Sequence, residues 1–161
     1  MIVLGIDPGT AITGYGLIRE ENGQAVALAY GAITTSSDLP LPDRLKLIQR
    51  DLAAIIEQHR PDQSAVEQLF FNKNVRTALA VGHARGVVLL TLAQANLPIY
   101  EYTPLEVKLA VTGYGRADKA QVQQMVTLLL GLSKVPKPDD VADALAIALC
   151  HLHSAKLTTL K

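Results

Sequence analysis

The sequence lacks the features that mark secreted and membrane-spanning proteins. It has a single cysteine, Cys150, among 161 residues, which excludes an internal disulfide and favours a reducing compartment. No uninterrupted apolar run reaches the ~18–20 residues of a membrane span, and Asp7 breaks the N-terminal apolar run too early for a signal peptide. We therefore expect a soluble, cytoplasmic protein without a membrane partner, in which Cys150 is a buried core thiol.

Net charge is also lacking, because 15 Lys and Arg residues balance 15 Asp and Glu residues. A neutral chain by itself argues against a nucleic-acid partner. The charges are unevenly distributed, however: residues 1–69 have 5 basic and 9 acidic side chains, residues 70–138 have 8 and 3, and residues 139–161 have 2 and 3. The basic middle of the chain fits a polyanionic partner and a merely solvated surface equally well.

Length and patterning predict one α/β domain over residues 1–161, since 49% of the residues are hydrophobic and no linker or repeat divides the chain. Apolar runs and turn signals such as Asn22-Gly23 indicate a strand, a meander, a helix and another strand, which together make a mixed sheet flanked by helices. The predicted strands are 2–7, 13–18, 25–33, 64–67 and 98–100; the predicted helices are 43–59, 79–94, 104–111, 117–130 and a last one from Asp139 or Asp140.

Four acids stand at the ends of predicted elements. Asp7 and Glu67 each close a short apolar strand, while Asp140 and Asp143 share one face at the start of the last helix. Singly, each acid is explained as a turn former or a helix cap. Jointly, they form an oxygen-only ligand set that suits Mg²⁺ or Mn²⁺. Two such ions roughly 3.5–4 Å apart can drive phosphodiester cleavage.

Both phenylalanines of the chain lie directly after Glu67, in a polar stretch with two cations. Aromatic rings there suit stacking on exposed bases, worth ~1–3 kcal/mol per base. The alternative is a packed loop before the next helix. The candidate nucleic-acid contacts in this stretch are Phe70, Phe71, Lys73, Asn74 and Arg76.

The helix after this stretch carries Ala78, Gly82 and Gly86 at a spacing of four. Small residues at that spacing let another helix approach closely, so they indicate either a dimer seam or packing on the chain's own sheet. His151 and His153 are two residues apart on the last helix and face apart, so we expect them to lie at a solvated helix end and not to share a metal.

Several motifs occur in a fixed order. Gly5-Ile6-Asp7-Pro8-Gly9 is followed by Thr13-Gly14-Tyr15-Gly16. The later segments are 44–48, 66–70 with Lys73 and Asn74, 84–87, 107–108, 118–119 and 140–146. With these segments the sequence, from residue 2 to about residue 153, resembles the RuvC family of Holliday-junction resolvases, which have an RNase H-like fold.

The resemblance implies a homodimeric, Mg²⁺-dependent endodeoxyribonuclease with two ions per active site, for which Mn²⁺ can substitute. Such an enzyme resolves Holliday junctions in DNA recombination and repair by cutting two opposed strands symmetrically. The four acids would be the metal-binding catalytic residues, Phe70 would stack on a base, and Lys108 and Lys119 would contact DNA and support catalysis. Arg116 joins the candidate DNA contacts, and a RuvA–RuvB branch-migration complex is the implied partner.

Three points stay open at this level. Asp139 leaves the register of the last acid pair ambiguous by one, although the Asp-x-x-Asp-Ala pattern favours Asp140. A non-catalytic junction-binding module is one alternative function. A sugar-kinase or actin-like phosphate-binding protein is another, because residues 5–10 resemble a first phosphate loop, but that fold needs a second domain for which 161 residues leave no room.

Overall fold

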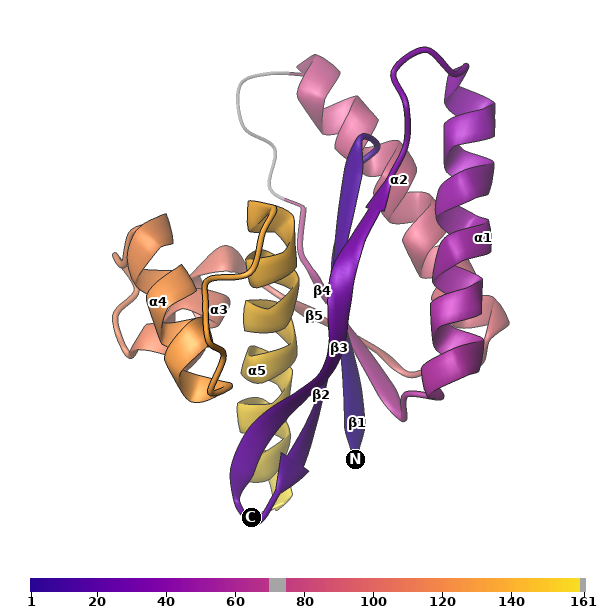
Figure 1. The fold of residues 1–161 in the computed structure, drawn as a ribbon. Helices are drawn as coiled ribbons and strands as arrows, with labels where there is room; N and C mark the ends of the chain where they lie inside the picture. The colour runs from indigo at the N-terminus through magenta and orange to yellow at the C-terminus, as the bar shows by residue number, and fades with distance from the viewer. Residues whose placement is uncertain (70–74, 160–161) are drawn as a thin grey trace.

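A mixed five-stranded sheet with the strand order β3-β2-β1-β4-β5 forms the centre of the protein (Figure 1). The structure is a computed structural model that describes residues 1–69 and 75–159, with side chains up to Ala155. Its elements are β1 (Ile2–Asp7), β2 (Ile12–Glu21), β3 (Gln24–Thr34), α1 (Leu41–His59), β4 (Gln63–Glu67), α2 (Val75–Gln94), β5 (Ile99–Tyr102), α3 (Pro104–Thr112), α4 (Lys119–Leu129) and α5 (Asp139–Thr159).

The strand directions follow from the connections. β1, β2 and β3 form an antiparallel meander, and Asn22 and Gly23 both take positive φ in the tight turn between β2 and β3. β4 and β5 run parallel to β1, because α1 and α2 return the chain to the same end of the sheet. Two helices begin earlier than the apolar periodicity predicts: α1 starts at Leu41 and α2 at Val75, and their first turns are mostly exposed. α4 begins two residues later than predicted, at Lys119.

Helices cover both faces of the sheet: α1 and α2 lie on one side, and α3, α4 and α5 on the other (Figure 1). Side chains alternate along β1, so Leu4 and Ile6 pack in the core beneath α1 and α2 while Val3 packs in the core beneath α5. The same alternation puts Ala65 of β4 on the α5 side. Asp7 lies four residues after Val3, and Glu67 lies two residues after Ala65. Both strand-end acids therefore face α5 as well.

The start of α5 lies unusually close to the sheet. A Cβ on Gly5 would fall against the carbonyl oxygen of Ala144, and one on Gly14 would fall against the carbonyl oxygen of Asp140. Only glycine at these two strand positions lets the helix backbone come so near. The close contact fixes the helix turn that carries the acid pair next to the end of β1.

The carboxyl-terminal half of α5 is more buried than the sequence suggests. Cys150 is buried as predicted, and burial raises the pKa of its thiol to about 11. The expectation of a solvated helix end is wrong for His151, which is 2% exposed. Its Nδ1 lies 2.7 Å from the Tyr102 hydroxyl, and its Nε2 lies 2.6 Å from Oε1 of Gln63, because α5 continues along β4 and β5 beyond this point. His153 faces elsewhere, toward the carbonyl oxygen of Ala110.

α2 has an unusual composition. Among the described residues it is the one helix with the length and hydropathy of a membrane span, with a mean hydropathy of 1.3, and only 22% of that window is buried. Length and composition of a single helix are weak grounds for a span. Two charged side chains, Arg76 and Arg85, lie within this helix, so its apolar residues do not form one unbroken run. The finding leaves an apolar helix surface that the chain itself does not cover.

The close approach of α5 gives a first prediction. Gly5→Ala should lower the free energy of unfolding by about 2 kcal/mol, because the added methyl group meets backbone and α5 has to move away. Urea unfolding measures the change. Gly31→Ala is the control, since there the new methyl meets only the hydroxyl end of Tyr15, and it should cost less. An unchanged Gly5→Ala variant would contradict the tight packing.

Candidate active site

Neighbouring parallel strands bring the first two acids together. Ile6 of β1 pairs with Val66 of β4, so Asp7 and Glu67, which follow them, end the two strands side by side. The carboxyl ends of parallel strands are where sites form in open α/β sheets. Both side chains are partly buried and face α5.

A cavity of about 270 Å³ joins these acids to three more charged side chains. Asp143 reaches it from the first turns of α5, Lys108 from α3 and Lys119 from the start of α4. The apolar residues Pro104, Val107, Val122 and Ala146 complete the wall. Three of the predicted acids and both predicted lysines therefore line one cavity.

The acids repel one another in this cavity. The pKa of the Asp7 carboxyl is raised from 3.8 to about 8, first by burial and then by the negative charges of Asp143, Asp140 and Glu67, while Lys119 acts in the opposite direction. Burial and the charge of Asp143 likewise raise the pKa of Glu67, with Lys108 and Lys119 opposing them. Because these groups favour their neutral forms, a bound cation would relieve both the burial and the repulsion.

The two neighbouring acids at the start of α5 have different surroundings. Asp140 does not line the cavity, but its charge acts on Asp7 and on Asp143. Asp139 instead lies 3.1 Å from Nζ of Lys137, and its pKa is lowered mainly by that hydrogen bond. Asp140 is thus the member of the pair that acts on the strand-end acid, in agreement with the Asp-x-x-Asp spacing.

The lysines are held by capped helices. Nζ of Lys119 lies 3.2 Å from Oδ2 of Asp143 and 3.6 Å from Oδ2 of Asp139. Lys119 opens α4, where Asp118 and Gln121 form a capping box, and the pair Thr103 and Glu106 caps α3 in the same way ahead of Lys108. The sequence analysis missed both boxes, although Thr-x-x-Glu and Asp-x-x-Gln are readable signals.

The predicted DNA contacts are only partly described. Phe70, Phe71, Lys73 and Asn74 lie outside the described residues. Arg76 is exposed in the first turn of α2, and Arg116 is exposed between α3 and α4. In the sequence the stretch 70–74 lies between Glu67 at the cavity and the start of α2.

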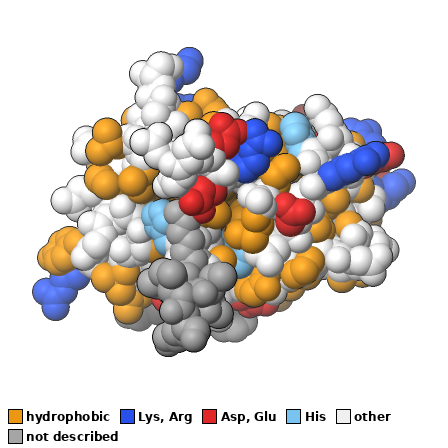
Figure 2. Space-filling view, turned by 90° about the horizontal axis from the view of Figure 1, so that it is seen from below, with side chains coloured by type: hydrophobic (Ala, Val, Ile, Leu, Met, Phe, Trp, Pro, Cys, Tyr) orange, Lys and Arg blue, Asp and Glu red, His pale blue; other side chains and the backbone are white. Residues whose placement is uncertain are grey.

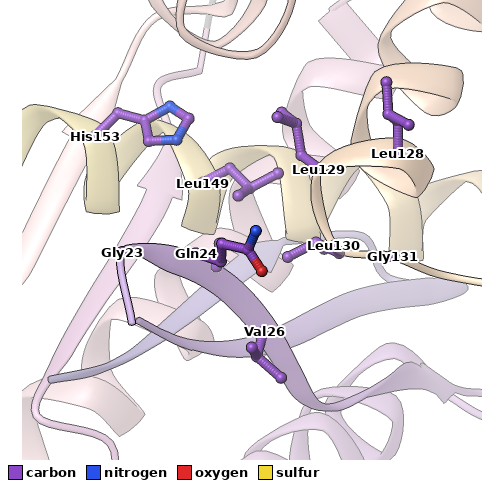
Figure 3. A pocket seen from close by; sticks show the side chains of 10 residues that line it. Gly23, Gln24, Val26, Leu128, Leu129, Leu130, Gly131, Leu149 and His153 are labelled. Carbon is purple, nitrogen blue, oxygen red and sulfur yellow. The ribbon is translucent and has the colours of Figure 1, made fainter. Parts of the chain in front are cut away.

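The opposite end of the molecule has a different character. Viewed from below, acidic, basic and apolar side chains are interspersed there, with no band of one sign among the described residues (Figure 2). A larger cavity of about 440 Å³ lies at this end, between the turn of β2 and β3, the end of α4, and α5 (Figure 3). Its lining is mostly apolar and contains His153 but neither an acid nor a lysine. The larger cavity therefore lacks the charged groups that make the smaller one the candidate active site.

The donor set can be tested against a divalent cation. Within the described ranges no three acidic, His or Cys side chains already form a metal site, and Asp143 is paired with Lys119 instead. The donors that meet at the cavity are nevertheless all carboxylate oxygens, which are the ligands that Mg²⁺ and Mn²⁺ prefer. Their chemistry fits such an ion once the side chains rotate toward it.

A family model decides the relationship. The model for crossover junction endodeoxyribonuclease RuvC matches residues 3–151. The chain belongs to the RuvC family. It is 61% identical to the RuvC of Alkaliphilus oremlandii and 57% identical to that of Desulfitobacterium hafniense; each alignment covers 98% of this chain, and 96% and 95% of the respective relatives. The predicted family is confirmed.

Solved structures agree with this family. The structure of Thermus thermophilus RuvC in complex with a Holliday junction substrate has a TM-score of 0.93 and 38% identity, covering 99% of this chain and 97% of that one. A fowlpox virus resolvase bound to junction DNA has a TM-score of 0.62 at 15% identity, which shows a shared fold alone. The predicted RNase H-like fold class of the RuvC family is thereby confirmed.

The raised pKa of Asp7 gives a second prediction. Its folded-state pKa lies above the ordinary value. Between pH ~4 and 8 the metal-free folded protein therefore keeps a proton on Asp7 that the unfolded chain has already lost. That contribution to stability is full below pH ~4 and is lost as the pH rises through about 8. Mg²⁺ needs the ionised carboxylate, so its affinity should rise up to about tenfold per pH unit and level off above pH ~8. Calorimetric titration in buffers of different ionisation enthalpy checks this. An affinity independent of pH between about 6 and 8 would contradict it.

Proposed function

We propose that this protein is a metal-dependent endonuclease that resolves Holliday junctions by nicking two opposed strands symmetrically. The observation that carries the proposal is the meeting of Asp7, Glu67 and Asp143 with two lysines in one cavity, in a chain of the RuvC family. The Thermus thermophilus relative is described in complex with a Holliday junction substrate. Mg²⁺ is the proposed ion, with two per site, and Mn²⁺ is able to substitute.

The residues divide the chemistry between them. Asp7, Glu67, Asp140 and Asp143 would hold the metal. When bound, the ions would activate a water and stabilise the leaving oxygen. Lys119, already against Asp143, would offset negative charge that develops on the scissile phosphate. Lys108 acts on Glu67 from the other wall of the cavity.

The segment after Glu67 is the proposed reader of the junction. In this proposal Phe70 stacks on a base near the crossover. The surrounding contacts would come from Phe71, Lys73, Asn74, Arg76 and Arg116. A RuvA–RuvB complex would present the junction, and the reaction would take place in the cytoplasm.

The third prediction tests the acids. Asp7→Asn should reduce junction nicking by at least about a hundredfold, because the amide keeps the shape but not the charge that holds the cation. Junction affinity should be nearly unchanged. The melting temperature without metal should not fall near neutral pH, since the raised pKa of Asp7 already keeps this carboxyl mostly neutral, as the amide is. Asp38→Asn, at an exposed loop position, is the matched control and should cut normally.

Parallel gel-shift and nicking assays with Mg²⁺ or EDTA separate the proposal from its alternatives. If the wild type binds junctions but never cuts them with metal, it is a binding module. ATP hydrolysis without DNA would instead favour the kinase-like protein. Cutting by Asp7→Asn at the wild-type rate would remove this residue from the mechanism.

Symmetric cutting also requires a second site. One chain supplies one carboxylate cavity, whereas a junction has two equivalent strands to cut, so a two-fold dimer is the simplest arrangement. The proposed seam is the α2 stripe of Ala78, Gly82 and Gly86. Among the described residues, a Cβ on either glycine would meet no atom within 4 Å, so no described part of the chain packs against these glycines. The stripe is flanked by Val75, Leu79 and Leu90, which are 71%, 59% and 56% exposed.

The fourth prediction tests this seam. Gly82→Leu should separate the paired helices and give monomers in sedimentation velocity at micromolar concentration, with paired incision of a junction lost but Mg²⁺ binding retained. Gln124→Leu puts the same side chain on an exposed position of α4 and should stay dimeric. A stable Gly82→Leu dimer would show that the seam lies elsewhere. A wild type that stays monomeric even on junction DNA would contradict symmetric cutting by a dimer.

A further inference from the structure

Arg85 makes contacts that neither the proposed metal site nor the proposed seam on α2 requires. It projects from α2, and its side chain is only 15% exposed. Its Nη2 lies 2.8 Å from Oε2 of Glu101 on β5, and its Nε donates to the carbonyl oxygen of Glu67 at 3.4 Å. One guanidinium thus joins a helix to the ends of two strands, one of which carries a proposed metal ligand.

The contact falls where the backbone of Glu67 leaves the sheet. Glu67 is the last residue of β4 and pairs with Tyr102, and the next amide, that of Gln68, donates to the Tyr102 carbonyl oxygen at 2.8 Å. The peptide group between Glu67 and Gln68 is thus bonded at both ends: its N–H donates to Tyr102, and its carbonyl oxygen accepts from Arg85. A carboxylate on a flexible glutamate chain among like charges moves outward unless its backbone is fixed, so this contact bears on where the carboxylate lies.

Arg85 acts through the backbone and not through its charge. Glu101 neutralises the guanidinium, and the groups that shift the pKa of Glu67 are its burial, Asp143, Lys108 and Lys119. A second polar contact links α2 to the other strand end, because Oγ1 of Thr10 donates to the carbonyl oxygen of Ala80 at 2.8 Å. The helix of the proposed seam is thereby linked to the segments next to both strand-end acids.

We propose that Arg85 is a positioning residue that fixes the peptide of Glu67 to α2 and so sets the metal affinity of the carboxylate cavity. This rests on the proposed function in one respect, the assignment of Glu67 as a metal ligand. Because Arg85 adjoins Gly86 of the seam, a displacement of α2 would also reach Glu67.

The competing explanation is an ion pair with Glu101 that only stabilises the fold. Lysine separates the two, because a single ammonium can still pair with Glu101 but cannot also reach the Glu67 carbonyl as the guanidinium fork does. Arg85→Lys therefore removes the positioning contact and keeps the charge. Glu101→Gln does the reverse, since its amide oxygen still accepts from Arg85 while the ion pair is lost.

The test is a calorimetric Mg²⁺ titration of the full chain without DNA, together with single-turnover nicking over a range of Mg²⁺ concentrations. Arg85→Lys should raise the Mg²⁺ dissociation constant about tenfold, the lower end of the effect of losing a contact that orients a metal ligand. Nicking should recover at saturating Mg²⁺, and junction affinity and melting temperature should stay near wild type. Glu101→Gln should change the constant less, and Arg50→Lys, at an exposed pair on α1, should not change it.

Two results would overturn the proposal. One is a wild-type Mg²⁺ constant for Arg85→Lys; the other is an equal increase for Arg85→Lys and Glu101→Gln with a matching loss of melting temperature, which is the pattern of a structural ion pair. Glu67→Gln separates a failure of the metal-ligand assignment from a failure of the positioning role of Arg85. If it leaves Mg²⁺ binding unchanged, the site assignment itself fails. If it weakens binding and Arg85→Lys does not, only the positioning role fails.

Discussion

Repulsion between buried carboxylates is the constraint on which the rest of this structure depends. Asp7 and Glu67 are fixed at adjacent strand ends by the parallel pairing of β1 and β4, and Asp143 is brought to them by a helix that touches the sheet backbone at Gly5 and Gly14. Burial first, and then the charges of the other acids, raise the pKa of Asp7 to about 8. A fold that holds these groups together without metal gives up stability that a divalent cation bound there would return.

The elements around the cavity can be understood as supports for that charge. Both α3 and α4 have capped first turns; Lys119 opens α4, and Lys108 lies one turn into α3, so both lysines have defined places at the cavity. α2 contacts the backbone of Glu67 through Arg85, and it also carries an exposed apolar face. Chemistry, junction contact and dimer formation would then share one helix and the segment that precedes it.

Local patterns predicted much of this arrangement. The runs ending in Asp7 and Glu67, the turn at Asn22 and Gly23, and the ordered motifs are enough to indicate the mixed sheet and the RuvC family. What failed depends on tertiary contacts. The burial of His151 follows from where α5 lies on β4 and β5, and the contact of Arg85 with Glu67 joins residues 18 apart whose pairing no local pattern encodes. The spacing of the acids already favoured Asp140 over Asp139, and the charge of Asp140, not of Asp139, acts on Asp7.

The central claim is that the carboxylates at the strand ends hold the catalytic ions. Anomalous diffraction from a crystal soaked in Mn²⁺, which shares the oxygen-ligand preference of Mg²⁺, tests it most directly. The account predicts anomalous peaks within the cavity, ligated by Asp7 and by carboxylates of Glu67, Asp140 or Asp143, with Lys119 displaced from Asp143. Manganese bound only elsewhere on the protein, with the cavity acids still paired to Lys119, would contradict it.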